Sequence, residues 1–231
     1  MSLLAVVFDF DGVLADSEPL HYEVFRMVLA RHGVDLDRDE YYARYLGYDD
    51  AGAFRAVFED RGREMSGPEI ERLVQEKLEL FPSVLDGRQV LFPGAESCVH
   101  RLADYVPVAI ASGALSHDIE LILGGTGLRS RFTAIVAADH TARSKPDPEP
   151  YARAVALLQE RGAVPAGDGV HRRIVAIEDS HWGLQSARGA GLACVGITTS
   201  YSAGELGLAD LIVRSLDEVT PERLEALVGR S

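Results

Sequence analysis

The chain has 231 residues, of which 47% are hydrophobic, enough to bury the core of one domain and a smaller second one. Its 36 acidic and 23 basic side chains give a formal net charge of −13, which argues against non-specific binding to nucleic acid or to an anionic membrane. Its two cysteines, Cys98 and Cys194, lack the spacing of a zinc site or a disulfide framework, so both are predicted to lie in the core. The N-terminal apolar run is too short for a signal peptide or a membrane span, and we expect a cytoplasmic protein.

Five short apolar runs, rich in β-branched residues, are typical of strands that are buried on both faces. Segments with helical spacing separate the later runs, and this alternation predicts βαβ units with parallel strands. We therefore expect an α/β fold, with a Rossmann-like parallel sheet core and helices on both faces. The predicted strands are Leu3 to Phe8, Pro107 to Ala111, Thr133 to Ala138, Ile174 to Ile177 and Cys194 to Ile197, and the predicted helices between them lie at Ile119 to Leu123, Tyr151 to Arg161 and Trp182 to Arg188.

The stretch after the first predicted strand contains no further strand pattern until about residue 88. Leu20 begins an amphipathic pattern with apolar residues four, seven and eight positions later, and Gly33 stands where a helix C-cap is expected. Further helical patterns cover Ala51 to Arg61 and Pro68 to Phe81. We therefore predict an all-helical insertion over residues 17–87, while residues 1–16 and 88–231 form the α/β core domain.

Two acidic residues follow the first strand in the sequence FDFDG, where Asp9 and Asp11 precede Gly12. In open parallel sheets, ligands bind beyond the carboxyl ends of the strands, so these side chains are candidates for a site. Two neighbouring carboxylates repel each other unless a cation or a shared proton is present, and an oxygen-preferring ion such as Mg²⁺ suits them. The alternative is that both residues only cap the following turn.

Three other predicted strand ends carry residues suited to binding an anion or a metal. Ser112 and Gly113 offer a hydroxyl and an amide that could hold phosphate oxygens, and Lys145 stands in a loop restricted by prolines. Glu178 and Asp179 form a second acidic pair. Each feature alone could be an ordinary turn, a solvated lysine or a helix N-cap, but together they predict one site.

These motifs, FDFDGVLADS, ASG, KPDP and IEDS in this order, resemble those of the haloacid dehalogenase-like hydrolases, in the branch with a helical cap after the first strand. The resemblance covers essentially the whole chain and includes β-phosphoglucomutases and phosphoglycolate phosphatases. It implies that Asp9 is the nucleophile that forms an aspartyl phosphate and that Asp11 is the general acid and base. Phosphoryl transfer depends mainly on positioning and charge neutralisation, which agrees with these residue types.

The same resemblance implies the roles of the other strand-end residues. Ser112 and the Gly113 amide would hold phosphoryl oxygens, and Lys145 would neutralise charge. Mg²⁺ would be bound by Glu178 and Asp179, together with the Asp9 carboxylate and the Asp11 main-chain carbonyl. The resemblance thus implies a Mg²⁺-dependent phosphatase acting on a small phosphorylated metabolite, a sugar phosphate, as a monomer or weak homodimer.

The predicted cap gives the basis for choosing between a phosphatase and a sugar-phosphate mutase. Ser17 and His21 match the mutase pattern at the entry to the cap, and Gly47 matches its glycine. The mutase carries a lysine before that glycine and an arginine three residues after it, where this chain has Leu46 and Asp50. Loss of these cations argues against holding a bisphosphate, so we expect a phosphatase. The mutase remains the alternative, with Arg44 or Arg55 as replacement cations.

Two other classes are less consistent with the motifs. A non-catalytic sensor with this fold would be expected to have lost a catalytic carboxylate, whereas Asp9 and Asp11 are both present. A dehalogenase is not expected to carry the acid and base that Asp11 provides in the phosphoryl-transfer branches.

Overall fold

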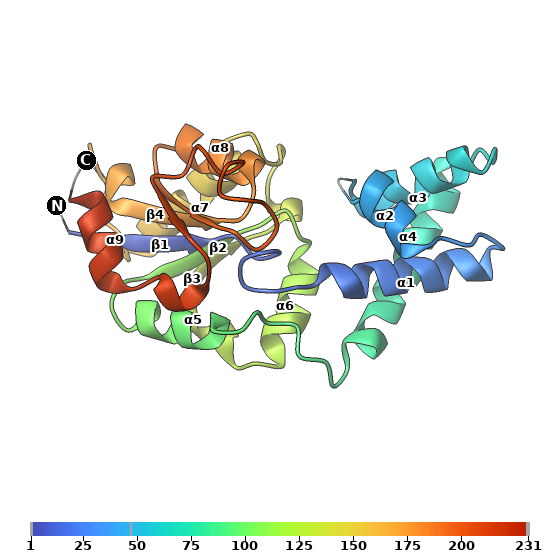
Figure 1. The fold of residues 1–231 in the computed structure, drawn as a ribbon, viewed down its shortest axis with the longest axis horizontal. Helices are drawn as coiled ribbons and strands as arrows, with labels where there is room; N and C mark the ends of the chain where they lie inside the picture. Colours follow the sequence, from blue (N-terminus) through green and yellow to red (C-terminus); the bar gives the residue numbers. More distant parts are fainter. Residues whose placement is uncertain (1, 47, 230–231) are drawn as a thin grey trace. The chain divides into compact units, whose positions relative to one another are not determined.

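The computed structural model describes residues 2–46 and 48–229, and the chain forms two compact units. One unit combines Met1–Asp16 with Val90–Ser231, and the other is the continuous segment Ser17–Gln89. Figure 1 shows that the helical unit is inserted after the first strand. In the described part of the chain, no helix combines the length and the apolar character needed to cross a bilayer.

The first unit is built on a parallel sheet, as the apolar runs predict. Its strands are ordered β3-β2-β1-β4-β5-β6, and all the pairings are parallel. The chain thus builds outward from β1 in one direction and then returns to add strands on the other side, so the order reverses between β1 and β4. The strands are β1 (Ala5–Phe8), β2 (Val108–Ala111), β3 (Phe132–Val136), β4 (Ile174–Glu178), β5 (Ala193–Ile197) and β6 (Leu211–Val213).

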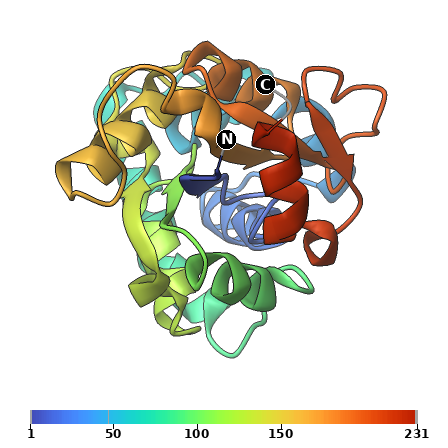
Figure 2. The same ribbon diagram turned by 90° about the vertical axis from the view of Figure 1, so that its left-hand side faces the viewer.

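Helices cover both faces of this sheet (Figure 1, Figure 2). Helices α7 and α8 pack against one face, while α5 and α9 contact strands from the other. The predicted α/β class is therefore confirmed. The helices of this unit are α5 (Ala95–Ala103), α6 (Ser116–Gly124), α7 (Glu149–Glu160), α8 (His181–Gly189) and α9 (Pro221–Val228), with short 3₁₀ turns η1 (Leu128–Arg131), η2 (Ala138–His140), η3 (His171–Arg173) and η4 (Leu216–Glu218).

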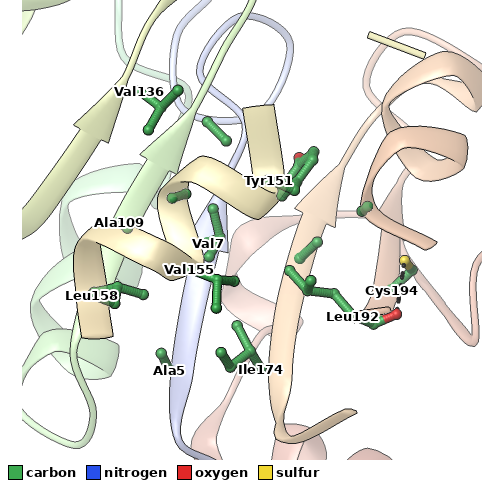
Figure 3. Packing of buried hydrophobic residues seen from close by; sticks show 14 of the residues in the cluster. Ala5, Val7, Ala109, Val136, Tyr151, Val155, Leu158, Ile174, Leu192 and Cys194 are labelled. Carbon is green, nitrogen blue, oxygen red and sulfur yellow. Dashed lines mark hydrogen bonds between the residues drawn. The ribbon is translucent and has the colours of Figure 1, made fainter. Parts of the chain in front are cut away.

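The core beneath α7 shows why the strands are continuously apolar. Ala5 and Val7 of β1 face α7, where Val155 and Leu158 cover them (Figure 3). Side chains alternate along a strand, so the intervening residues of β1 point to the opposite face, which is also buried. Complete burial of a side chain such as Leu158 contributes about 1.5–3 kcal/mol.

In its described residues, the second unit consists of four helices with well-defined ends. Gly33, at a φ of 73°, follows the first helix as predicted, and the Asp49 side chain caps the third by accepting from the Gly52 amide at 2.7 Å. Phe25 and Phe54 stack with ring centroids 4.2 Å apart in its core. These helices are α1 (Glu18–Arg31), α2 (Arg38–Arg44), α3 (Asp50–Asp60) and α4 (Gly67–Leu85).

Candidate active site

The site of the α/β unit is built where the strand order reverses, at the carboxyl ends of β1 and β4. Phe8 is paired with Ile177, so Asp9 leaves β1 beside the end of β4, and its amide donates to the Ile177 carbonyl at 2.9 Å. In doubly wound sheets, this reversal opens a crevice for ligands. The sheet register alone therefore brings Asp9 beside Glu178, which is the last residue of β4.

A tight turn directs the chain away after Asp9. The Phe10 carbonyl accepts hydrogen bonds from the amides of Val13, Leu14 and Ala15, and Gly12 has a φ of 80°. A Cβ at Gly12 would lie 2.0 Å from Asp179 Oδ2, so glycine is required both for the backbone conformation and for the close approach. The turn thereby places main chain directly against the second acidic pair.

Three buried carboxylates meet at this point. Ligand oxygens of Asp9, Glu178 and Asp179 all lie within 4.8 Å of one another. Burial, together with the Asp9 charge, raises the pKa of Glu178 to about 8 and that of Asp179 to about 6. Ionisation of these carboxyl groups is therefore unfavourable in free energy, and a bound cation would offset this cost.

Lys145 supplies part of the compensating charge. Its ammonium Nζ lies 2.7 Å from Asp9 Oδ1 and 2.6 Å from Glu178 Oε1, with only 12% of the side chain exposed. Burial alone would lower its pKa, but the two carboxylates outweigh that effect and raise the pKa above its ordinary value. Lys145 is therefore a buried cation and not the solvated loop lysine of the alternative interpretation.

The donor set fits a hard divalent cation. With all three carboxyl groups ionised, as metal ligands must be, three carboxylates against one ammonium would leave two negative charges, and all three ligand atoms are oxygens. Oxygen-only sets of this kind suit Mg²⁺, Mn²⁺ or Ca²⁺ better than softer metals. The acidic cluster could thus hold one divalent metal ion, as the sequence predicted for these residues.

Glu178 is fixed by neighbours that were not predicted from the sequence. The Tyr151 hydroxyl donates to Glu178 Oε1 at 2.6 Å, and the Ser180 hydroxyl donates to Oε2 at 3.3 Å. Tyr151 stands on the inner face of α7, where Figure 3 shows it among the core residues. In the sequence, Tyr151 occupies a position typical of a core residue of an amphipathic helix. Only its closeness to the KPDP motif could have suggested that its hydroxyl contacts the site.

Gly183 allows helix α8 to begin against the Glu178 carboxylate. A Cβ added to Gly183 would lie 2.0 Å from that carboxylate, although the backbone is helical and unstrained. We expect Gly183→Ala to weaken binding of a divalent cation by about tenfold or more, because supporting residues of metal ligands typically have such effects. Calorimetric titration with Mg²⁺ measures this change.

The control is Gly124→Ala in α6, where an added Cβ has open space. Alanine should leave metal binding unchanged there and should not destabilise the helix. Equal Mg²⁺ affinity in Gly183→Ala and the unsubstituted protein would contradict the assignment of Glu178 as a ligand.

Ser112 and Gly113 follow β2, the neighbour of β1, at the same edge of the sheet. Ser112 is buried, its amide donates to the Val136 carbonyl at 2.9 Å and its hydroxyl accepts from the Ala114 amide at 3.0 Å. Gly113 is exposed, and outside Gly113 and its two chain neighbours no heavy atom of the described residues lies within 4 Å of where its Cβ would be. The geometry leaves room for an anion beside Gly113, while the phosphate-binding role of both residues stays a prediction.

Asp11 lies in the turn after β1 and is partly buried. A β-bridge with Ala15 fixes its main chain there. The β-bridge concerns only the main chain, so the role of the Asp11 carboxyl group as acid and base stays a prediction.

The predicted cap residues belong to the helical unit. Ser17 is buried at the start of α1, and His21 lies one turn further along. Gly47 lies outside the described residues, so its role stays a prediction. Within this unit, His21 Nδ1 lies 3.0 Å from Lys77 Nζ, and its ring stacks on Phe81 with centroids 4.9 Å apart.

Asp50, which stands where the mutase pattern has a cation, forms an ion pair within the helical unit. Asp50 Oδ1 lies 2.5 Å from the Nζ of Lys77, whose side chain is only 3% exposed. Lys77 was not predicted from the sequence, because a lysine within an amphipathic helix ordinarily lies on the solvated face. The helical unit thus contains a buried cation, Lys77, although Leu46 and Asp50 replace the two cations of the mutase pattern. Lys77 is paired with Asp50.

Comparisons with known proteins agree with this site. The family model of the haloacid dehalogenase-like hydrolases matches residues 3–191. Protein CbbY of Rhodobacter capsulatus is 32% identical, with 89% of each chain covered, and hexitol phosphatase B of Escherichia coli is 28% identical, with 96% of each covered. A crystal structure of a CbbY variant from Rhodobacter sphaeroides, in complex with xylulose-(1,5)bisphosphate, has a TM-score of 0.78 and 29% identity, covering 94% of this chain and 96% of the other.

The extent of the family match, together with the identity to CbbY over most of both chains, confirms the resemblance inferred from the four motifs. The prediction of a hydrolase is confirmed with it. This chain belongs to the haloacid dehalogenase-like hydrolases.

Proposed function

We propose that the chain is a Mg²⁺-dependent phosphatase that hydrolyses a small sugar or polyol phosphate through an aspartyl phosphate on Asp9. The observation that carries the proposal is the position of the Asp9 carboxylate, held by Lys145 beside the buried acids Glu178 and Asp179. Hexitol phosphatase B and the CbbY complex with a sugar bisphosphate support phosphorylated carbohydrates as the substrate class.

The first step uses Asp9 as the nucleophile. Lys145 Nζ and the Phe10 amide both contact Asp9 Oδ1, each at 2.7 Å, and so fix the orientation of the carboxylate. A carboxylate oxygen attacks phosphorus, an aspartyl phosphate forms, and the bond to the leaving alcohol breaks. Asp11 donates a proton to the leaving oxygen, so the alcohol departs neutral.

The second step regenerates the enzyme. Water attacks the phosphorus of the aspartyl phosphate, Asp11 takes a proton from that water, and the Asp9 carboxylate and inorganic phosphate are released. Ser112 and the Gly113 amide bind phosphoryl oxygens during both steps, and Lys145 balances their charge. Mg²⁺, bound by Asp9, Glu178, Asp179 and the Asp11 carbonyl, would supply further charge neutralisation at the phosphoryl group.

We assign substrate selection to the helical domain, predicted as residues 17–87, and catalysis to residues 1–16 and 88–231. Ser17, His21 and Gly47 are the proposed contributors from the helical domain. This division of roles explains how one catalytic core could serve different phosphate esters.

A substrate screen tests the proposal. The protein is incubated with Mg²⁺ and a panel of hexitol phosphates, ketose phosphates, xylulose 1,5-bisphosphate and phosphoglycolate, and free phosphate is measured. We expect phosphate release from a carbohydrate phosphate, and its loss in excess chelator. Conversion of β-glucose 1-phosphate into glucose 6-phosphate with little free phosphate would instead establish the mutase.

A further inference from the structure

A pocket with a volume of about 330 Å³ lies in the α/β unit, at the edge of the sheet opposite the candidate active site. Its residues come from the segments that lead into β4, β5 and β6, which are parallel neighbours, whereas the acidic cluster lies at the carboxyl end of β4. The proposed chemistry therefore does not use this pocket. Its lining residues are Arg172, Arg188, Gly191, Leu192, Ala193 and Asp210.

Arg188 presents a guanidinium that is held in place but only partly used. Its Nη1 donates to the Leu208 carbonyl at 2.9 Å and to Asp210 Oδ1 at 2.8 Å. A guanidinium has five N–H donors, so Nε and Nη2 keep three that have no hydrogen-bond partner among the described residues. The side chain is 46% exposed, so a ligand can reach it. Arg188 is thus ordered in advance, which lowers the entropic cost of binding an anion.

Arg172 brings a second guanidinium to the same pocket. It is exposed and has no hydrogen bond or ion pair with any other residue that the structure describes. Its backbone is nevertheless fixed, because Nδ1 of the neighbouring His171 donates to the Ala190 carbonyl at 2.7 Å. In a chain with 36 acidic and 23 basic side chains, an arginine without an acidic partner is available for an external anion.

The charges of the pocket leave an excess of one positive charge. The Asp210 carboxylate offsets one of the two guanidiniums, and its Oδ2 accepts from the Cys194 amide at 2.8 Å. Each carboxylate oxygen has a further lone pair, so Asp210 can also accept a hydrogen bond from a hydroxyl. Leu192 and Ala193 add apolar surface, and the volume is that of a small-molecule site and exceeds the size of an inorganic anion.

Each arginine alone has an ordinary explanation. Water is sufficient to solvate Arg172, and the ion pair between Arg188 and Asp210 links the end of α8 to the start of β6. What indicates a ligand site is that both guanidiniums, with unused donors, line one pocket that also offers an acceptor and an apolar wall.

We propose that this arginine pocket binds a small phosphate ester that carries free hydroxyl groups. The phosphate accepts hydrogen bonds from Arg172 and from Nε and Nη2 of Arg188, because guanidinium forks match phosphate oxygens in geometry and charge. A hydroxyl of the same ligand donates to Asp210. The proposal concerns binding alone and is independent of the proposed phosphatase function.

Calorimetric titration of the metal-free protein with glycerol 3-phosphate, in excess chelator and at low ionic strength, tests the proposal. Without metal, the acidic cluster and Lys145 together carry no net positive charge, so the candidate active site should not retain a phosphate ester. We expect one molecule to bind per chain and the affinity to fall as salt is added. Methyl phosphate, which has no hydroxyl beyond its phosphate, should bind more weakly, and glycerol should not bind.

Two substitutions assign the binding to the arginine pocket. Arg172→Gln should weaken it at least about tenfold, because a charged donor to the phosphate is lost, and the fold should be unaffected because no contact is removed. Arg188→Gln should have an effect of similar size. Arg153→Gln is the matched control, since it removes the same charge from a side chain that is 44% exposed and pairs with Glu160 outside the pocket. It should bind glycerol 3-phosphate as before.

Ser112→Ala separates the arginine pocket from the candidate active site and should leave this affinity unchanged. Absence of binding, or binding that survives both arginine substitutions but is lost in Ser112→Ala, would overturn the proposal. Equal weakening in Arg153→Gln and Arg172→Gln would also overturn it, because net charge alone would then explain the effect. Equal affinities for methyl phosphate and glycerol 3-phosphate would contradict the contact with Asp210.

Discussion

Asp9→Asn is expected to reduce phosphate release by about 10⁴-fold or more, because an amide cannot act as the nucleophile. Asparagine has nearly the same shape, and its oxygen can still accept from Lys145 and from the Phe10 amide. The variant should therefore remain folded. Steady-state phosphate release, measured with the best substrate of the screen, gives the loss of turnover.

Asp168→Asn is the matched control, since Asp168 is exposed in the loop after α7 and belongs to none of the four motifs. It should retain full activity. Turnover of Asp9→Asn within tenfold of the unsubstituted enzyme, after deamidation has been excluded by mass spectrometry, would contradict the role of Asp9.

Lys145→Met should have the second largest effect, on stability as well as activity. Methionine has a similar length but no charge, so the carboxylates of Asp9, Glu178 and Asp179 would face one another without the ammonium. Removing one partner of a buried ion pair typically costs about 3 kcal/mol or more in the free energy of unfolding. We expect this loss in urea unfolding without metal, and a loss of phosphate release of at least about 100-fold.

The pH dependence of the free energy of unfolding follows from the raised pKa of Glu178. Its pKa is raised from an ordinary value of 4.5 to about 8 in the folded, metal-free protein, so the folded state binds more protons than the unfolded state between these values. The free energy of unfolding therefore falls as the pH rises through this window. Without Lys145 the pKa of Glu178 would rise further, so this fall should extend to higher pH, and Mg²⁺ should reverse it.

Arg143→Met tests whether any loss of charge in this loop has the same result. The Arg143 side chain is 68% exposed and pairs only with surface acids among the described residues, so its replacement should change stability little. If Lys145→Met unfolds at the same urea concentration as the unsubstituted protein, with and without Mg²⁺, the proposed electrostatic role is wrong.

The sequence was sufficient for the sheet and for the residues at its carboxyl edge. Strands such as β1 and β4 are continuous apolar runs, and the polar residues that end them are fixed by sheet register. Asp9 and Glu178 could therefore be placed together from sequence, since neighbouring parallel strands end at one edge. Strand β6 was missed, because Leu211–Val213 is too short to show a pattern.

Other elements escaped prediction for physical reasons. Helix α2 has only seven residues and one buried side chain, Tyr41, so it has no apolar stripe. Helices α5 and α9 were missed although their buried residues have helical spacing, because each pattern covers only about two turns. These residues are Ala95, Cys98, Val99 and Leu102 in α5, and Leu224 and Val228 in α9.

Long-range polar contacts were the least predictable feature of both units. Lys77 and Asp50 are 27 positions apart, and each has an ordinary surface explanation when viewed alone. Only the packing of α3 against α4 brings them together and buries the lysine. Tyr151 is similar, since its hydroxyl finds Glu178 only after α7 packs on the sheet. Long-range pairing of this kind depends on tertiary structure.

The most direct test of the proposed mechanism is detection of a phosphoryl group on Asp9. The enzyme is mixed with Mg²⁺ and substrate, quenched with acid during a single turnover, digested, and analysed by mass spectrometry. We expect a transient phosphoryl group on the peptide containing Asp9, removable by hydroxylamine as is typical of an acyl phosphate, and none in Asp9→Asn. Full phosphate release with no phosphoryl group on Asp9 at any quench time, or with the group on another residue, would contradict the mechanism.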